Sequence, residues 1–533
     1  MGANWLAGRW GTSPGSETLD PRARAFARRR LGEPVIAPAP ESGTLRPSRL
    51  TAEDLERLFA SIPASLGDDE RARYARGMSY LDFLAWRSED TRDAPDAVLF
   101  PEDHEQVVSI LRVCSREGIA VVPVGGGTSV TGAITADWQS AVSIVISTRQ
   151  LDRILDIDVE SGIAHVQSGA TGPHVEAQLA EVGWTLGHFP QSWERASIGG
   201  FIAARSSGQS SSGYGRIEDM LLGARVATPI GTWDVGGFPA ASTGPDLRQL
   251  VLGSEGTLGV VTSAHLRLRK GPVIRQYEAA VMPGGFERAV HAMRLIAQSP
   301  MRPTVIRASD MDETDALLTM SMPGGLLGSA LGKYLSMRSA LPGSLIIVGW
   351  EGVRADHVAA ARSQTRELLE GAIWLGRRPG DSWERGRFHG PYLRDALMDE
   401  GYLVETFETV AQWSNISALH ESVRRAAMAA LGERSYVMAH ISHSYDTGAS
   451  LYFTVLAGGW ADPQESASRW RDAKQQITTA IVAGGGAISH HHGVGRDHRS
   501  WLPEQIGSVG ASVLGAVKSV IDPNGVLNPG ALL

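Results

Sequence analysis

The spacing of apolar residues predicts helices and strands along most of the chain after residue 95. Apolar side chains between Val107 and Cys114 repeat at helical spacing, and Gly118 follows as a helix end. Short apolar runs rich in β-branched residues predict strands over 97–100, 119–124, 143–146, 163–166, 223–226 and 258–261. With a further helix over 174–183, this pattern predicts a mixed domain of helices and strands between residues 96 and 272.

A second set of helices and strands follows this domain. The periodicity predicts helices over 286–298, 356–369, 417–431 and 465–483, and strands over 344–350 and 451–456. Before residue 96 we expect an irregular arm over 1–50 and a helix from Thr51 to about Ala75. The chain therefore divides into 1–95 (an N-terminal arm and helical region), 96–272, 273–485, and a tail over 486–533 with a histidine-rich loop and a helix over 506–521.

Composition and charge narrow the class of protein. Of the 533 residues, 43% are hydrophobic and 20% charged, as in ordinary globular proteins. The net charge of −8 argues against nucleic acid as the main partner, because phosphate binding needs a basic surface. The single cysteine, Cys114, allows no internal disulfide. We see no secretory leader and no apolar run long enough to span a membrane, and we expect a cytoplasmic protein.

Three segments rich in glycine and small polar residues lie within residues 120–262. The first reads Pro123-Val124-Gly125-Gly126-Gly127-Thr128-Ser129 and follows a predicted strand. Its backbone N–H groups can form a nest for a pyrophosphate, although a tight glycine turn has the same composition. It is neither a Rossmann fingerprint nor a Walker A loop, because the spacing of G-x-G-x-x-G and the Gly-Lys-Ser/Thr sequence are both missing.

The other two segments are also rich in glycine and small polar residues. One runs from Gly253 through Glu255-Gly256-Thr257-Leu258-Gly259-Val260-Val261, and the other runs from Gln191 to Phe201 and on to Gly208. A capped β-turn and a Ser/Gly-rich surface loop are the alternatives for these two segments. Backbone with few side chains also suits a planar ligand that it must approach closely.

Together the three segments resemble the FAD-binding domain of the vanillyl-alcohol oxidase family, also called the p-cresol methylhydroxylase (PCMH) type. The resemblance implies an α+β fold: a PCMH-type FAD-binding domain of two subdomains (96–272), an α+β cap domain for the substrate (273–485), and a C-terminal segment that returns to the FAD domain. It also implies FAD as the cofactor. The implied FAD-binding residues are Pro123, Val124, Gly125, Gly126, Gly127, Thr128, Ser129, Gln191, Ser192, Ser197, Gly200, Ala204, Arg205, Ser206, Ser207, Glu255, Gly256, Thr257, Leu258, Gly259, Val260 and Val261.

The tail narrows the resemblance. The sequence His490-His491-His492-Gly493-Val494-Gly495 is similar to the signature of the alkyldihydroxyacetonephosphate synthases. That resemblance implies exchange of an acyl for an alkyl group on a phosphorylated ketone, with chemistry at the flavin N5 atom, and a role in lipid biosynthesis. Two alternatives stay open: an FAD-linked oxidase or dehydrogenase that takes hydride from a hydroxylated substrate, and a flavoprotein without catalysis.

The resemblance also assigns roles to individual side chains. Tyr452 matches a tyrosine that handles the substrate proton, and Arg307 matches an arginine near the flavin. A core tyrosine and a surface ion pair are the structural alternatives. Where the synthases carry an arginine for substrate phosphate, this chain has His440, which cannot form a bidentate fork. We expect His440 and His443 to contact the substrate as well.

The histidines of the tail suit proton transfer near pH 7. On an extended segment His490 and His492 would point one way and His491 the other, so we expect at most two of them to line one site. A histidine-rich turn is the structural alternative, and a metal centre needs a third ligand at tetrahedral spacing. We expect no metal.

Two expectations concern the cofactor and the partners. The glycine-rich loop has no histidine or cysteine, and Cys114 lies on the apolar face of a predicted helix, so we expect FAD to be bound without a covalent link. We expect a small-molecule substrate with an anionic group and a lipid-like part. Peripheral membrane association and a homodimer are compatible with this reading.

Overall fold

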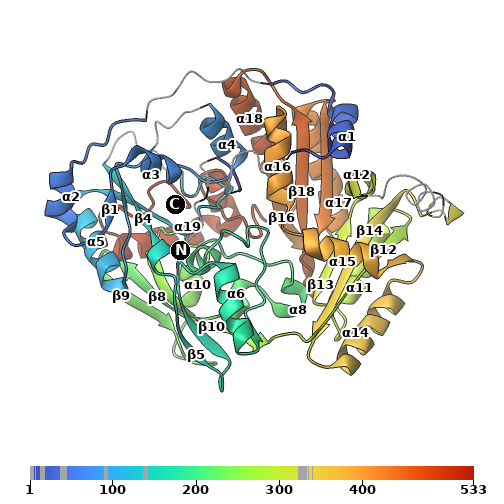
Figure 1. Cartoon of the computed structure of the whole chain (residues 1–533), viewed down its shortest axis with the longest axis horizontal. Coiled ribbons are helices and arrows are strands. Elements are labelled where there is room, and N and C mark those ends of the chain that lie inside the picture. The colour runs from blue at the N-terminus through green and yellow to red at the C-terminus, as the bar shows by residue number, and fades with distance from the viewer. Residues whose placement is uncertain are drawn as a thin grey trace.

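The computed structural model describes residues 5, 8–11, 18–36, 45–88, 94–135, 142–321, 333, 335, 337–338 and 340–533. The described strands form four sheets in two blocks that lie side by side (Figure 1). One block holds the two smaller multi-stranded sheets together with the C-terminal helix. The other is built on one large sheet. This is the α+β architecture that the resemblance implied.

The first block contains two sheets that pack on one helix. In the first sheet the strands β2 (Ala97–Leu99), β4 (Ser143–Ser147) and β3 (Ala120–Val124) run parallel, and β1 (Ala64–Ser65) adds an antiparallel edge. The second sheet is antiparallel in the order β5-β6-β10-β8-β9. Between them lies α5 (His104–Glu117), whose buried face carries Val107, Leu111 and Cys114. Gly118 ends this helix in the left-handed conformation, as the pattern predicted.

The remaining strands of this block are listed here with their bounds: β5 (Ile154–Asp158), β6 (Ile163–Gln167), β8 (Leu221–Thr228), β9 (Gly231–Gly236), β10 (Val260–Arg267), and the paired short strands β7 (Trp184–Thr185) and β11 (Arg269–Lys270).

The second block is built on an antiparallel sheet in the order β15-β12-β14-β13-β17-β18-β16. Its strands are β12 (Ile274–Pro283), β13 (Val305–Ser309), β14 (Gly343–Gly352), β15 (Ile373–Gly376), β16 (Tyr402–Gln412), β17 (Ser435–Ile441) and β18 (Gly448–Gly458). The pleat gives this sheet two different faces. The rings of Phe407 and Phe453 stack 4.9 Å apart on one face, and Phe453 also stacks on His420 of α17 (Ile416–Leu431). The residues that alternate with them face the other way, toward the first block.

The helices have the following bounds: α1 (Pro21–Leu31), α2 (Ala52–Phe59), α3 (Asp68–Arg73), α4 (Tyr80–Arg87), α6 (Gly172–Glu181), α7 (Ile198–Ala203), α8 (Ser211–Tyr214), α9 (Ile217–Met220), α10 (Arg248–Val251), α11 (Phe286–Ala297), α12 (Met311–Ser321), α14 (Ala355–Leu368), α15 (Arg377–Gly386), α16 (Gly390–Asp399), α17 (Ile416–Leu431), α18 (Pro463–Ala483) and α19 (Leu502–Ile521).

The N-terminal region differs from the sequence prediction in two places. Within the arm expected to be irregular, Pro21–Leu31 forms α1, which Asp20 caps and which buries Phe26, Ala27 and Leu31. Figure 1 shows α1 beside the large sheet, far from α2 and α3. The helix expected over 51–75 is two helices, because Pro63 lies between them and the short strand β1 pairs there with β2.

The tail returns to the first block, as the resemblance implied. Leu527 pairs with Val121 of β3, and the Asn528 side chain donates to the carbonyl oxygens of Ala133 and Glu255 at 2.9 and 2.7 Å. This return brings the histidine-rich loop against the glycine-rich segments. Among the described residues, no helix is both long and apolar enough to cross a membrane.

Candidate active site

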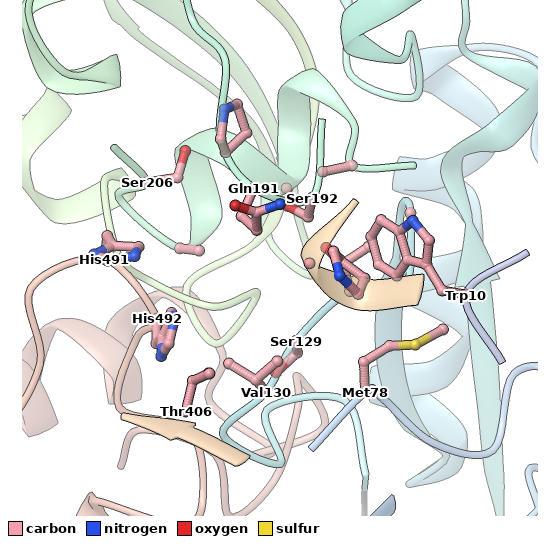
Figure 2. A pocket seen from close by; sticks show the side chains of 18 of the residues that line it. Trp10, Met78, Ser129, Val130, Gln191, Ser192, Ser206, Thr406, His491 and His492 are labelled. Carbon is pink, nitrogen blue, oxygen red and sulfur yellow. The ribbon is translucent and has the colours of Figure 1, made fainter. Parts of the chain in front are cut away.

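A cavity of about 470 Å³ lies between the two blocks, and residues from many separate parts of the chain line it. Figure 2 shows Ser129 and Val130 of the glycine-rich loop on one side, Gln191, Ser192 and Ser206 on another, and His491 and His492 from the tail. The first block supplies mostly backbone and small polar groups. The second supplies the large sheet's inner face.

The segment 123–129, whose first two residues end β3, forms one wall of the cavity. Gly127 has φ of +66°, which favours glycine. A Cβ on Gly126 would lie 2.1 Å from the carbonyl oxygen of Arg195 and 2.8 Å from the Cα of Ala196. Glycine is therefore required at 126 for the packing of this loop against the 191–201 segment, rather than to leave room for a ligand.

The 191–207 segment adds hydroxyl groups to the same wall. Ser197 caps α7 by accepting from the backbone N–H of Gly200, and both residues line the cavity. Thr148, which also lines it, has a buried Oγ1 with no hydrogen-bond partner among the described residues. A ligand with phosphate or hydroxyl groups satisfies such an atom, so glycine backbone and free hydroxyls here fit FAD.

The 253–261 segment closes the wall and ties it to the tail. A Cβ on Gly256 would lie 2.4 Å from Cγ of Pro123, so the two segments touch directly. Glu255 lines the cavity and accepts hydrogen bonds from the backbone N–H groups of Val494 and Gly495. Burial raises the pKa of Glu255 to about 7 although these two hydrogen bonds lower it.

Most of the predicted FAD-binding residues line this cavity, and three do not. The Arg205 side chain pairs with Glu218 and donates to Gln249, away from the cavity. Thr257 caps a turn through Ser254, and Leu258 is a core side chain. All the other predicted FAD-binding residues line the cavity: Pro123, Val124, Gly125, Gly126, Gly127, Thr128, Ser129, Gln191, Ser192, Ser197, Gly200, Ala204, Ser206, Ser207, Glu255, Gly256, Gly259, Val260 and Val261.

The histidine loop wraps around a carboxylate that the sequence analysis did not single out. Glu408 of β16 accepts hydrogen bonds from the backbone N–H groups of His490, His491 and His492 at 2.6, 3.1 and 2.9 Å. Burial would raise the pKa of Glu408, but the neighbouring histidines and these hydrogen bonds lower it to about 2. The sequence of β16 does not single out Glu408, because the same strand also carries Glu405.

The expected alternation of the three histidines is wrong. The loop bends around Glu408 instead of running extended, so His491 and His492 both line the cavity and His490 does not. Their rings lie 4.6 Å apart. Burial lowers the pKa of His491, and it lowers that of His492 to about 3, so both are neutral at pH 7.

His490 and His443 lie behind this wall, in a hydrogen-bonded network. His490 contacts the hydroxyl of Tyr445 at 2.6 Å and Nδ1 of His491 at 2.9 Å, and His443 contacts the Ser211 hydroxyl at 2.8 Å. Ring nitrogens of His443, His490 and His491 lie within 4.8 Å of one another, so among the described residues this trio is the group that could hold a metal ion. Our expectation that the protein uses no metal stays a prediction.

Tyr452 and His440 stand side by side on the inner face of the large sheet. They are opposite partners on β18 and β17, and their rings stack at 5.0 Å. Tyr452 also stacks on His491 at 5.9 Å. Burial raises the pKa of Tyr452 to about 12, which keeps its hydroxyl protonated. These three side chains and Arg307 line the same cavity, whereas His443 does not.

The predicted arginine is already paired. Arg307 Nη2 lies 2.8 Å from Oε1 of Glu313, and the same oxygen lies 3.0 Å from Nδ1 of His440. No sequence motif marked Glu313, which lies in the first turn of α12, six residues after Arg307. Its acidic position in a first helical turn reads as ordinary helix stabilisation and gave no signal of a site.

An apolar chamber continues the cavity away from the glycine-rich wall. Side chains from four elements line it: Ala23, Phe26 and Ala27 of α1, Leu317 and Met320 of α12, Leu393 and Leu397 of α16, and Met438, Val404 and Leu456 of the large sheet. These residues are far apart in the sequence. We expected a lipid-like substrate from the sequence, but no motif marked any of these residues.

Comparison with known proteins defines the class. The FAD binding domain family model matches residues 95–235, and the model of the FAD linked oxidases, C-terminal domain, matches residues 277–532. The fold of p-cresol methylhydroxylase superimposes with a TM-score of 0.66 at 15% identity, covering 96% of this chain and 97% of that one. The protein is thus an FAD-dependent enzyme with the PCMH-type fold.

More similar relatives define the family. The alkyldihydroxyacetonephosphate synthase of Trypanosoma brucei brucei is 31% identical over 495 residues, which cover 90% of this chain and 80% of the relative. A solved alkyldihydroxyacetonephosphate synthase structure has a TM-score of 0.81 at 28% identity, covering 97% of this chain and 94% of that one. The chain belongs to the alkyldihydroxyacetonephosphate synthase family.

Proposed function

We propose that the protein exchanges the acyl group of an acylated ketone phosphate for a long-chain alcohol. The observation that carries this proposal is the single cavity in which the glycine- and hydroxyl-rich wall continues into the apolar chamber. A fatty chain can bury its methylene groups in the chamber at about 0.8 kcal/mol each while its polar end reaches the flavin. The names of the relatives in the family support the same reaction.

The residues around the cavity have distinct tasks in this proposal. Bound FAD supplies an electron-accepting isoalloxazine ring. The backbone of 123–129 would hold its pyrophosphate, and the free Thr148 hydroxyl lies on the same wall. Tyr452 is protonated and can donate a proton, and the neutral His491 and His492 can accept one. Arg307 would face the anionic end of the substrate.

A direct assay tests this proposal. FAD-loaded protein is incubated with palmitoyl-dihydroxyacetone phosphate and 1-hexadecanol, and products are followed by mass spectrometry. We expect hexadecyl-dihydroxyacetone phosphate and one palmitate for each ether formed, with no consumption of oxygen. Flavin-loaded protein that forms neither product would overturn the proposal.

A second candidate is oxidation of a hydroxylated substrate, with hydride passing to the flavin. The observation that favours it is the neutral charge of the Arg307 corner, where Glu313 pairs with the arginine and His440 is uncharged. A dianionic phosphate gains less there than at a free cation. Anaerobic bleaching of the flavin by a 2-hydroxy acid or an alcohol would establish this reaction instead.

The proposal extends to partners and location. We place the protein in lipid biosynthesis in the cytoplasm, without a nucleic-acid partner. We propose that it is a homodimer that binds membranes peripherally, where it collects a lipid-like anionic substrate. The apolar chamber supports a lipid-like ligand. Sedimentation analysis at several protein concentrations tests the dimer, and flotation with phosphatidylcholine vesicles, with and without anionic lipid, tests the membrane contact.

A further inference from the structure

The buried carboxylate of Glu313 lies between the side chains of Arg307 and His440, which both line the cavity. Glu313 is 6% exposed and shares its Oε1 atom between Arg307 Nη2 and His440 Nδ1. Its Oε2 atom is buried with no hydrogen-bond partner among the described residues. All three side chains line the cavity. Such an arrangement orients His440 and leaves the arginine only partly free.

The contact with Glu313 determines which nitrogen of His440 carries the proton. An ionised carboxylate only accepts hydrogen bonds, so the Nδ1 atom 3.0 Å away must be the protonated one. The Nε2 atom of a neutral His440 then has a free lone pair. No hydrogen bond to Nε2 is found within the part of the chain that the structure describes.

The charged and titratable groups around His440 keep it neutral and Glu313 ionised. These groups are Arg307 on β13, Glu313 on α12, Tyr452 on β18 and His491 in the tail. Burial and then Arg307 lower the pKa of His440, although Glu313 raises it. Burial would raise the pKa of Glu313, but Arg307 and His440 lower it to about 2. At pH 7 the pair therefore holds one proton and one negative charge.

We infer that Glu313 and His440 form a carboxylate–imidazole dyad in which His440 Nε2 accepts the hydroxyl proton of the substrate. The O–H bond breaks, its electron pair stays on the substrate oxygen, and an N–H bond forms at Nε2. Glu313 stays ionised and stabilises the imidazolium, so the charge of the pair changes from −1 to zero. His440 acts on the substrate directly, and Glu313 is a positioning residue.

Three other titratable groups of the cavity suit this step less well. Tyr452 already carries its proton. His491 shares a hydrogen bond with His490, and Glu255 is bound to the backbone of Val494 and Gly495. The inference rests on the proposed function only in that the substrate bears a hydroxyl group, and both the exchange and the oxidation meet that condition.

Four variants separate a catalytic from a structural role: Glu313→Gln, His440→Gln, the double variant, and Glu278→Gln as the matched control. Glu278 is another buried carboxylate of the second block, paired with Arg362 and Arg366 and absent from the cavity wall. FAD content and melting temperature are measured first. The rate of hexadecanol exchange is then measured between pH 5 and 9.

We expect each single cavity variant to keep FAD and lose about 100-fold in kcat, with KM changed less than threefold. The double variant should lose no more than the worse single variant, because the two residues act as a unit. In the wild type, activity should fall as pH drops through the pKa of His440. That acidic limb should move to lower pH in Glu313→Gln and vanish in His440→Gln. Glu278→Gln should match the wild type.

A second readout does not depend on turnover. Nitrogen NMR of protein labelled in its histidines, with His440 assigned from the His440→Gln variant, reports which ring nitrogen is protonated. We expect the Nδ1–H form in the wild type and a mixture of both forms in Glu313→Gln. An Nε2–H form in the wild type would overturn the dyad, and so would single variants with wild-type kcat and pH profile. If the wild type exchanges nothing, the proposed function fails, and the NMR result still decides whether His440 offers the free Nε2 atom.

Discussion

The flavin-binding wall and the apolar chamber are parts of one cavity, but they are built in different ways. The wall comes from three short runs of consecutive residues, 123–129, 191–207 and 254–261, which line the cavity mainly with backbone and small side chains. The chamber comes from single side chains on α1, α12, α16 and alternate positions of β16, β17 and β18. A continuous motif therefore identifies the cofactor, whereas only the folded chain identifies the space for the substrate.

The largest effect should come from the wall. A Cβ at Gly126 would overlap the backbone of Arg195 and Ala196, so Gly126→Val should separate two of the three cofactor segments. We expect the flavin-to-protein ratio to fall more than tenfold, measured by absorbance at 450 nm after gel filtration. Gly515→Val is the control, since a Cβ there meets no atom within 4 Å. Full flavin occupancy in folded Gly126→Val would refute the packing described for the two segments.

The next largest effect should come from the boundary between the two parts. Tyr452→Phe and His491→Ala remove proton-transfer groups and keep the glycine-rich wall, so both variants should bind FAD and lose about 100-fold in kcat. His165→Ala, on the β6 strand of the first block, is a histidine control that leaves the cavity unchanged. Normal turnover by both cavity variants would place the chemistry elsewhere.

A substitution in the chamber should lower activity only for substrates with a long chain. Ala27 of α1 lines the chamber and is 1% exposed, so Ala27→Phe should fill space that a long chain needs. We expect kcat/KM to fall about tenfold for palmitoyl substrates, which corresponds to about 1.4 kcal/mol, and little for hexanoyl substrates. Ala177→Phe, at an exposed position of α6, serves as the control. An equal loss for both chain lengths would show that Ala27 does not face the chain.

The last effect concerns the pH dependence of stability rather than activity. The pKa of Glu255 is about 7 in the folded protein against 4.5 for the free side chain, so the folded state binds the proton more tightly. This group therefore lowers the free energy of unfolding as pH rises from about 4.5 to 7, by about 3 kcal/mol at most. Glu255→Gln should remove that part of the decline. Urea unfolding at pH 5 and pH 8 measures it, and an identical pH dependence in wild type and variant would contradict the raised pKa.

The sequence predicted the regular parts of the fold because their signals are local. The helix that became α5 ends at Gly118, and the strands that became β3 and β14 are short apolar runs. It missed α1 because five arginines hide a narrow apolar stripe, although Asp20-Pro21 is an ordinary helix start. The prediction of a single helix over 51–75 is wrong, because Pro63 lies between α2 and α3.

Local signals also decide which residues of the candidate site could be predicted from the sequence. The glycine segments, Tyr452, His491 and His492 were found because a motif or a resemblance carries them. Glu408 and Glu313 were not found, because their partners His490 and His440 lie 82 and 127 residues away and no local pattern links them. Thr148 was not found, because its role rests on a hydroxyl group that has no hydrogen-bond partner among the described residues. Bending of the histidine loop around Glu408 also could not be read from three consecutive histidines.

A crystal structure of the FAD-loaded protein with 1-hexadecanol tests most directly whether one cavity holds both cofactor and chain. We expect the FAD pyrophosphate to lie against residues 125–129. We expect the alkyl chain to lie among Phe26, Met320, Leu397 and Leu456, with the hydroxyl group of the alcohol within hydrogen-bond distance of His440 Nε2. A chain bound outside this chamber, or FAD occupying the chamber itself, would contradict the account.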